Sequence, residues 1–184
     1  MEGIDSNKNQ IRRQINELKK QITAGQKEQA ADLVFKKIEL LPEFSSAKTI
    51  LMYWSTADEL PTHKFIQKWS VEKVILLPSV VEDDIEIKKY SSKENLKRGK
   101  LGIYEPEMDG VYVGKVDLTI VPGVAFDLHK NRLGRGKGYY DRFFNGIETL
   151  KWGVCFDLQL LPSVPTNSDD KPMNKVISPT KIIE

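Results

Sequence analysis

Cysteine is nearly absent from this sequence: Cys155 is the only one among 184 residues. A single cysteine cannot form an intramolecular disulfide, so disulfides do not stabilise this chain. Histidine is also scarce, and no Cys/His cluster has the spacing of a zinc site. Because Cys155 lies in the apolar stretch Trp152–Phe156, we expect a buried, unreactive thiol. The alternative is a catalytic nucleophile, for which only His63 and His129 could act as the base.

Long apolar runs are missing as well. The longest, such as Val74–Leu77, are far too short to cross a membrane. The first ten residues are polar and lack the apolar core of a signal peptide. These absences predict a cytoplasmic protein with no membrane partner.

The sequence has little excess charge of either sign. It holds 28 Lys and Arg against 26 Asp and Glu, a formal net charge of +2. No global field therefore attracts the chain to nucleic acid or to a membrane, and any anion site must be local. Hydrophobic residues at 40% and charged residues at 29% are ordinary globular values. We expect residues 1–184 to form one domain.

Two apolar stripes at helical spacing occupy the first part of the chain. Ile11, Ile15, Leu18 and Ile22 recur every three or four residues and predict one helix. Ser6 is a candidate N-cap for this helix, and Gly25 a candidate end. Leu33, Val34, Ile38 and Leu41 predict a second helix, which Pro42 stops.

The period then changes to that of buried strands. Three short runs rich in β-branched and aromatic residues predict strands, at Thr49–Trp54, Val74–Leu77 and Val116–Val121. A helix at Thr62–Trp69, with Thr62 as N-cap, separates the first two, and a glycine-rich loop after the third leads into a helix at Tyr139–Leu150.

This order of elements predicts an α/β fold, a three-layer α/β/α domain with a mainly parallel, Rossmann-like sheet. Residues Glu82–Gly114 are polar and interrupted by glycine, so we expect short strands and loops inserted at one edge.

Ligands of open parallel sheets bind beyond the carboxyl ends of the strands. The loop after Val121 is the most informative of these ends. Between Asp127 and Arg142 it holds five Lys or Arg residues against two Asp, a local charge of +3. Positive charge is therefore concentrated at one place in a nearly neutral chain.

Glycines alternate with basic residues in this loop. Gly134, Gly136 and Gly138 allow the backbone to approach a ligand and present its N–H groups, while Arg135 and Lys137 add charge. A helix that starts after the loop directs its positive end to the same point. The pattern predicts a phosphate site, although it is neither a Walker P-loop nor a dinucleotide fingerprint. The alternative is a solvated basic loop.

Val121–Asp127 followed by Asn131–Asp141 resembles the signature of the 5-formyltetrahydrofolate cyclo-ligases, also called 5,10-methenyltetrahydrofolate synthetases. The resemblance extends over nearly the whole chain. Further matching segments are Lys8–Arg12, Asp58–Thr62, Gly102–Pro106, Gln159–Pro165, Asp170 and Met173–Val176. One departure is Asn174, where the family usually has Asp.

The resemblance implies that ATP phosphorylates the formyl oxygen of 5-formyltetrahydrofolate. Attack by N10 and loss of phosphate then give 5,10-methenyltetrahydrofolate. It also implies a Mg²⁺ cofactor, ATP as co-substrate and a monomeric enzyme.

The resemblance assigns roles to individual residues. Arg135 and Lys137 are implied to be catalytic, and Asp141 and Asp170 to hold Mg²⁺. Three residues are implied to bind the folate substrate: Glu59 at the pterin edge, Arg135 at the formyl oxygen, and Tyr139. The residues implied to bind ATP are Lys8, Arg12, Arg132, Leu133, Gly134, Arg135, Gly136, Lys137, Gly138, Tyr139 and Tyr140.

Two other functions remain open from the residues alone. Arg135–Tyr140 combines charge with aromatic rings, as in single-strand nucleic-acid modules, but the near-neutral total charge argues against that partner. A phosphosugar isomerase or an acyl-CoA transferase would also place a phosphate site on a similar sheet.

Overall fold

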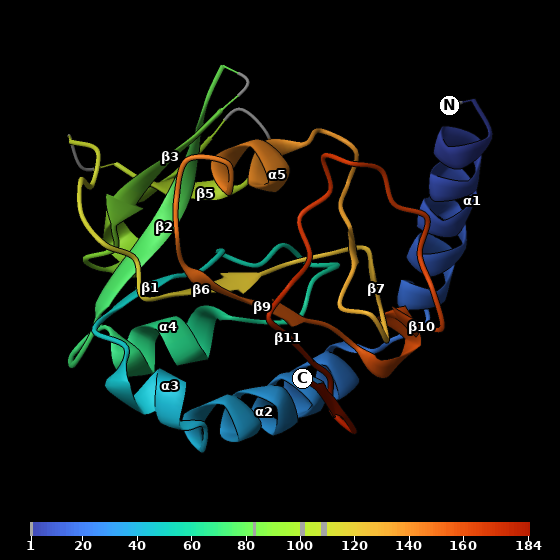
Figure 1. Cartoon of the computed structure of the whole chain (residues 1–184). Helices are drawn as coiled ribbons and strands as arrows, with labels where there is room; N and C mark the ends of the chain where they lie inside the picture. Colours follow the sequence, from blue (N-terminus) through green and yellow to red (C-terminus); the bar gives the residue numbers. More distant parts are fainter. Residues whose placement is uncertain (1, 83, 100–101, 108–109) are drawn as a thin grey trace.

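The computed structural model describes residues 2–82, 84–99, 102–107 and 110–184. They form a seven-stranded sheet with the order β12-β11-β9-β6-β1-β2-β3 (Figure 1). The five inner strands are parallel, and the two edge strands, β3 and β12, pair antiparallel to their neighbours. The strands are β1 (Thr49–Leu51), β2 (Val74–Val81), β3 (Asp84–Lys89), β6 (Leu118–Val121), β9 (Leu150–Val154), β11 (Lys175–Ile177) and β12 (Ile182–Ile183).

Burial on both faces explains the nearly continuous apolar runs of the inner strands. All residues of β1 and β6 are buried. On one face, Ile50 and Trp152 pack with Val34 and Ile38 in a single cluster. The mainly parallel α/β sheet expected from the sequence is therefore confirmed.

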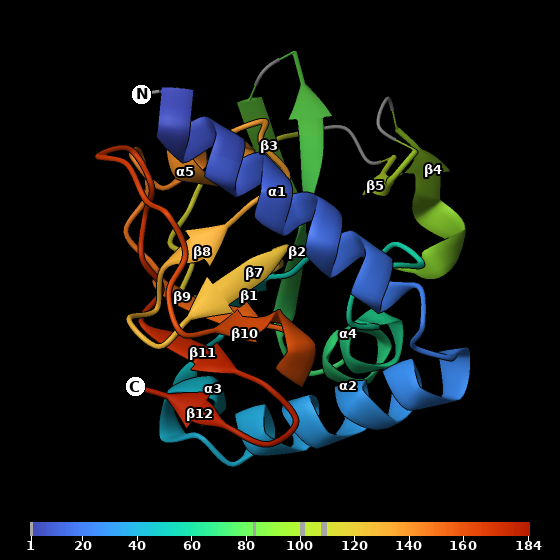
Figure 2. The ribbon, with the colours of Figure 1, turned by 90° about the vertical axis from the view of Figure 1, so that its right-hand side faces the viewer.

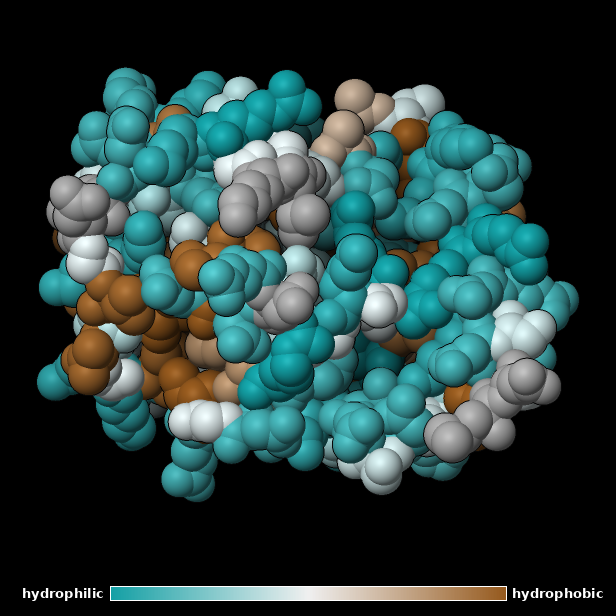
Figure 3. Space-filling view, turned by 90° about the horizontal axis from the view of Figure 1, so that it is seen from above, coloured by the Kyte–Doolittle hydropathy of each residue, from teal (hydrophilic) through white to brown (hydrophobic). Residues whose placement is uncertain are grey.

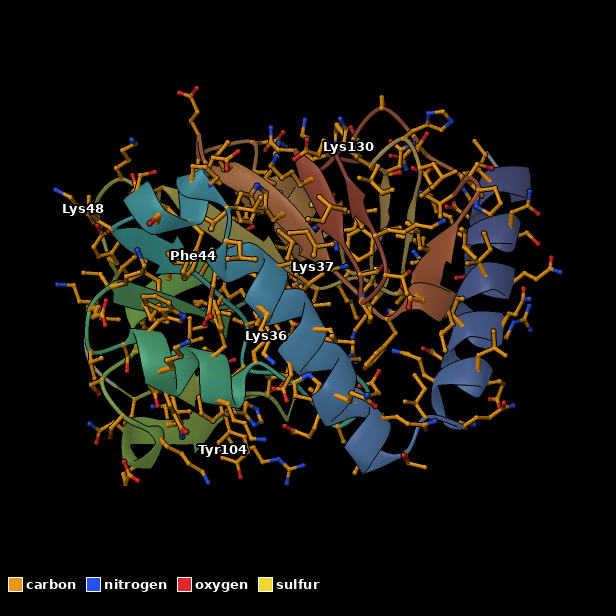
Figure 4. All side chains as sticks on the ribbon, turned by 90° about the horizontal axis from the view of Figure 1, so that it is seen from below. Lys36, Lys37, Phe44, Lys48, Tyr104 and Lys130 are labelled. Carbon is orange, nitrogen blue, oxygen red and sulfur yellow. The ribbon has the colours of Figure 1, made fainter. Side chains whose placement is uncertain are left out.

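Helices cover this sheet in layers. Figure 1 shows α2, α3 and α4 below the sheet, with α5 above it and α1 beside its end. Seen from below, α2 runs across the foreground, with Lys36 and Lys37 labelled along it (Figure 4). The helices are α1 (Glu2–Lys19), α2 (Ala24–Glu39), α3 (Pro42–Ser46), α4 (His63–Trp69) and α5 (Tyr139–Phe143). Among the described residues, none of the helices combines the length and apolar character needed to cross a membrane.

Two smaller sheets accompany the main one. In the first, β7 pairs with β8 and with β10, and α1 runs diagonally beside this sheet (Figure 2). The second, β4 with β5, falls within the segment expected to be inserted at one edge, as does the edge strand β3. These strands are β4 (Leu96–Arg98), β5 (Tyr104–Pro106), β7 (Ala125–Asp127), β8 (Arg132–Leu133) and β10 (Leu160–Leu161), and single 3₁₀ turns span Lys93–Asn95 and Asp157–Gln159.

The boundary between the first two helices differs from the expectation. Ser6 lies inside α1 and Gly25 inside α2, so neither marks a helix end. The break falls between Lys19 and Ala24, where Thr23 and Gln26 form a capping box at the start of α2.

Two later helices also differ. Thr62 precedes α4, but its hydroxyl donates to the Tyr53 carbonyl at 2.7 Å instead of capping the helix. The helix expected at Tyr139–Leu150 ends at Phe143, and Pro42 begins α3 after the second helix has ended. These ends depend on tertiary contacts, which the local pattern does not contain.

Candidate active site

The strand order reverses at the centre of the sheet. From β1 the chain passes through α4 to β2 on one side, whereas β6 lies on the other side of β1. Such a reversal opens a crevice at the carboxyl ends of the strands. A cavity of about 940 Å³ lies there, lined by residues of the loops after β1 and β6 and of α1. Seen from above, the surface is hollowed beside α1, with a hydrophilic rim around hydrophobic atoms (Figure 3).

The glycine-rich loop reaches this cavity in a conformation that needs glycine. Gly136 and Gly138 have φ of 98° and 68°. A Cβ on Gly138 would also lie 2.7 Å from the Arg142 guanidinium. The loop therefore brings its backbone to the cavity as expected. The following helix has only five residues, so its dipole adds less than the sequence suggested.

The basic pair on α1 contacts two loops of the cavity wall. The Lys8 ammonium donates to Asp170, and Arg12 Nε donates to the Gly134 carbonyl at 2.9 Å. Burial lowers the pKa of Arg12, although the charges of Asp5 and Asp170 act in the opposite direction. The expected second basic side of the cavity is thus present.

The cations of the glycine-rich loop have different environments. Arg132 is buried, with 5% of its side chain exposed, and its Nη2 donates to Asp141 at 2.9 Å. Arg132 also lies over the Tyr140 ring at 5.4 Å. Lys137 is exposed and lines the cavity, without an ion-pair partner among the residues that the structure describes. Lys137 is therefore available to a ligand, whereas Arg132 holds the cavity wall.

Arg135 extends from the same loop to the opposite side of the cavity. Its Nη2 lies 2.9 Å from Asp58 Oδ1 and 2.9 Å from Glu59 Oε1. The Thr56 hydroxyl is 3.1 Å from the same nitrogen. The loop after β1 and the glycine-rich loop after β8 are thus joined through one guanidinium.

Aromatic side chains form an apolar wall. Tyr53, Trp54, Tyr139 and Tyr140 all line the cavity. Trp54 is held from behind by the His63 ring, stacked at 4.2 Å. Burial raises the pKa of Tyr140, and the charge of Glu59 raises it further. The Tyr140 phenol therefore stays protonated in the cavity wall.

The two aspartates expected to bind metal both line the cavity but have partners from the chain. Asp141 accepts from Arg132 and, at 3.3 Å, from the Lys171 backbone N–H. Asp170 accepts from Lys8 and, at 2.8 Å, from the Asn167 N–H. Over the described ranges, no three His, Cys, Asp or Glu side chains gather into a metal cluster. Two carboxylates supplemented by phosphate oxygens and water still suit Mg²⁺.

Two residues of the site were missed from the sequence. Asp58 shares Arg135 with Glu59, and the last residue of α1, Lys19, donates to Asp58 Oδ2 at 2.8 Å. A signal existed for Lys19, because Lys8, Arg12 and Lys19 are four and seven residues apart and share one helix face. Cys155 is fully buried and burial raises its pKa, which agrees with the structural prediction for this thiol.

Comparison with known proteins gives a consistent result. The sequence model of the 5-formyltetrahydrofolate cyclo-ligase family matches residues 4–179. A 5-formyltetrahydrofolate cyclo-ligase of Haemophilus influenzae is 30% identical over 178 residues, covering 91% of this chain and 95% of the relative. A probable 5-formyltetrahydrofolate cyclo-ligase of Caenorhabditis elegans is 29% identical, covering 96% and 95%. The solved structure of Aquifex aeolicus 5,10-methenyltetrahydrofolate synthetase matches with a TM-score of 0.86 and 30% identity, covering 95% of this chain and 91% of the other.

Proposed function

Since this chain belongs to the 5-formyltetrahydrofolate cyclo-ligase family, we propose that it uses ATP to cyclise 5-formyltetrahydrofolate to 5,10-methenyltetrahydrofolate. One observation carries the proposal for this chain. The crevice at the strand reversal places a cationic glycine-rich loop opposite a carboxylate, Glu59, and an aromatic wall. A nucleotide phosphate and a planar pterin need these two kinds of surface side by side.

The first step activates the formyl group. Its oxygen attacks the γ-phosphorus of ATP, the bond from that phosphorus to the β,γ-bridging oxygen breaks, and ADP leaves. A formyl oxygen on nitrogen is a weak nucleophile, so alignment and charge neutralisation are the main tasks of the protein. Lys137 and the backbone N–H groups around Gly136 bind the phosphates in this proposal, and Arg12 keeps the loop in place through the Gly134 carbonyl.

The second step closes the ring. N10 attacks the formyl carbon and loses its proton, and the former formyl oxygen departs within inorganic phosphate. Arg135 neutralises the developing charge on the leaving phosphate, because its guanidinium already lies between the two loops.

Glu59 recognises the pterin. A carboxylate can accept two parallel hydrogen bonds from a 2-amino-pyrimidinone edge. Glu59 is largely buried, with 14% of its side chain exposed, so it reads such an edge with little competition from water. Tyr139 and Trp54 supply flat apolar contacts for the ring system.

Asp141 and Asp170 would hold Mg²⁺ beside the phosphates. The ion supplies charge neutralisation for the transferring phosphoryl group. Arg132 keeps the Asp141 carboxylate turned toward the cavity. The proposal includes a single-domain monomer in the cytoplasm, with no nucleic-acid or membrane partner.

The test is an assay of the purified protein, in which the absorbance of methenyltetrahydrofolate should increase with time. We expect it only when ATP, Mg²⁺ and 5-formyltetrahydrofolate are all present. Thermal shift with MgATP, 5-formyltetrahydrofolate, a sugar phosphate and single-stranded RNA separates the other functions, because a true ligand raises the melting temperature by mass action. Absorbance that stays flat in the complete mixture would contradict the proposal.

A further inference from the structure

The two carboxylates that share Arg135 differ in what holds their second oxygen. Asp58 Oδ2 accepts from the Lys19 ammonium at 2.8 Å. Glu59 Oε2 accepts the Thr56 backbone N–H at 2.9 Å. Asp58 is therefore bound to a second cation, whereas Glu59 is bound to a neutral group.

Lys19 fixes Asp58 more firmly than a surface ion pair would. Only 4% of the Lys19 side chain is exposed. A buried ammonium that lost its carboxylate would stay desolvated and unpaired, which is strongly unfavourable. Burial alone would raise the pKa of Asp58, but hydrogen bonds from Lys19 and Thr56 and the charges of Lys19 and Arg135 lower it. The Asp58 carboxylate thus stays charged and in place.

Glu59 is the carboxylate that can change partner. Its Oε1 already accepts from Arg135, so a substrate edge that binds both oxygens competes with Arg135 for this oxygen. Arg135 would then keep one carboxylate, Asp58, and its charge would remain paired. With 52% of its side chain exposed, Arg135 has room to turn.

We infer that Asp58, anchored by Lys19, is a positioning residue that keeps Arg135 directed into the cavity while Glu59 exchanges Arg135 for the substrate. The inference rests on the proposed function for the identity of that substrate. Asp58 itself acts only through the guanidinium.

A double-mutant cycle tests this role. Asp58→Asn should lower kcat about tenfold while the KM for ATP changes less than about twofold, because a misplaced Arg135 mainly affects the transition state. On an Arg135→Ala background the same substitution should cost less than about twofold, since no guanidinium remains to be positioned. Glu17→Gln, at an exposed α1 ion pair, is the matched control and should leave both constants unchanged. Wild-type kcat in Asp58→Asn, or losses that multiply in the double variant, would overturn the inference.

A second measurement needs no catalysis. Phenylglyoxal modifies accessible guanidinium groups, and peptide mass spectrometry reports the rate at Arg135. Asp58→Asn and Lys19→Met should each accelerate this modification about threefold or more, and Glu17→Gln should not. An unchanged rate in the first two variants would overturn the positioning role, even in an active enzyme. Faster modification in a protein that lacks the ATP-dependent absorbance change would support the positioning role and refute the proposed function.

Discussion

Replacement of Lys137 tests whether this lysine binds a ligand or is an ordinary surface lysine. It lines the cavity and has no ion-pair partner among the described residues. Lys137→Ala should therefore lower kcat/KM more than about tenfold, while exposed charges contribute only ~0–1 kcal/mol to stability. Lys36→Ala, on the far side of the molecule (Figure 4), is the control. Equal activity of the two variants in initial-rate assays would remove Lys137 from the site.

The stability of the protein should depend on pH through the protonation of His63, whose ring lies beside the cavity residue Trp54. Its ring is stacked on Trp54, and burial lowers its pKa below the ordinary 6.5. Below pH 6.5 the unfolded chain therefore takes up a proton that the folded chain still excludes, and the free energy of unfolding falls. The loss is complete when the pH has passed the lowered pKa of the folded state.

The measurement is the melting temperature between pH 7.5 and 5 for the wild type and for His63→Gln. The melting temperature of the wild type should fall further than that of the variant over this window. Parallel curves would show that another group causes the acid sensitivity.

Among the elements, the glycine-rich loop gives the sharpest prediction. Gly138→Ala places a Cβ at a backbone φ of 68°, which strains the loop, and 2.7 Å from the Arg142 guanidinium, which must shift. We expect a loss of about 1–2 kcal/mol in stability and a larger relative loss in kcat. Gly25→Ala is the matched control, because Gly25 lies in α2 with open space at its Cβ and should gain up to about 0.5–1 kcal/mol. Retained activity in Gly138→Ala, measured beside denaturant unfolding, would show that this backbone conformation is dispensable.

The same elements show what the sequence could predict. Buried strands such as β1 and β6 are covered on both faces, so their apolar runs identify them directly. The short strands β7 and β8 were not foreseen, because they lie within the basic loop and depend on pairing with each other and with β10. Thr62 is the N-cap residue of α4 as expected, but its hydroxyl binds the Tyr53 carbonyl in place of a helix N–H, which the local pattern does not show.

Within the site, the residue types were predictable but their partners were not. The loop from Arg132 to Tyr140, Glu59 and the basic pair on α1 all line one cavity, as the sequence and the resemblance indicated. The pairing of Arg135 with both Asp58 and Glu59 joins segments 76 and 77 residues apart. No local pattern encodes such a distance.

The metal proposal involves the whole molecule, because one proposed Mg²⁺ ligand, Asp170, also joins the C-terminal part of the chain to α1 through Lys8. Asp141→Asn and Asp170→Asn should each weaken activity at limiting Mg²⁺, and excess Mg²⁺ should restore part of it. If both carboxylates serve one MgATP, the double variant should be scarcely worse than the weaker single variant.

Initial rates across a Mg²⁺ titration measure these effects, with the melting temperature as the control for a lost ion pair. Glu39→Gln, which removes an ion pair on α2, should leave the Mg²⁺ dependence unchanged. If the losses of activity in the two single variants multiply in the double variant, or if the rates of the single variants do not depend on Mg²⁺, both aspartates have a purely structural role.

The contacts of α1 with distant parts of the chain also affect folding during synthesis. Lys8 and its partner Asp170 are 162 residues apart, and the Ile15 side chain of α1 packs in one cluster with Val124 and Val164. At about 5–20 residues per second, a ribosome exposes this helix roughly 8 to 30 seconds before Asp170 emerges. During that interval the apolar stripe around Ile15 is uncovered, and transiently exposed apolar surface makes a newly made chain prone to aggregate. α1 thus leaves the exit tunnel well before the segment that completes its native contacts.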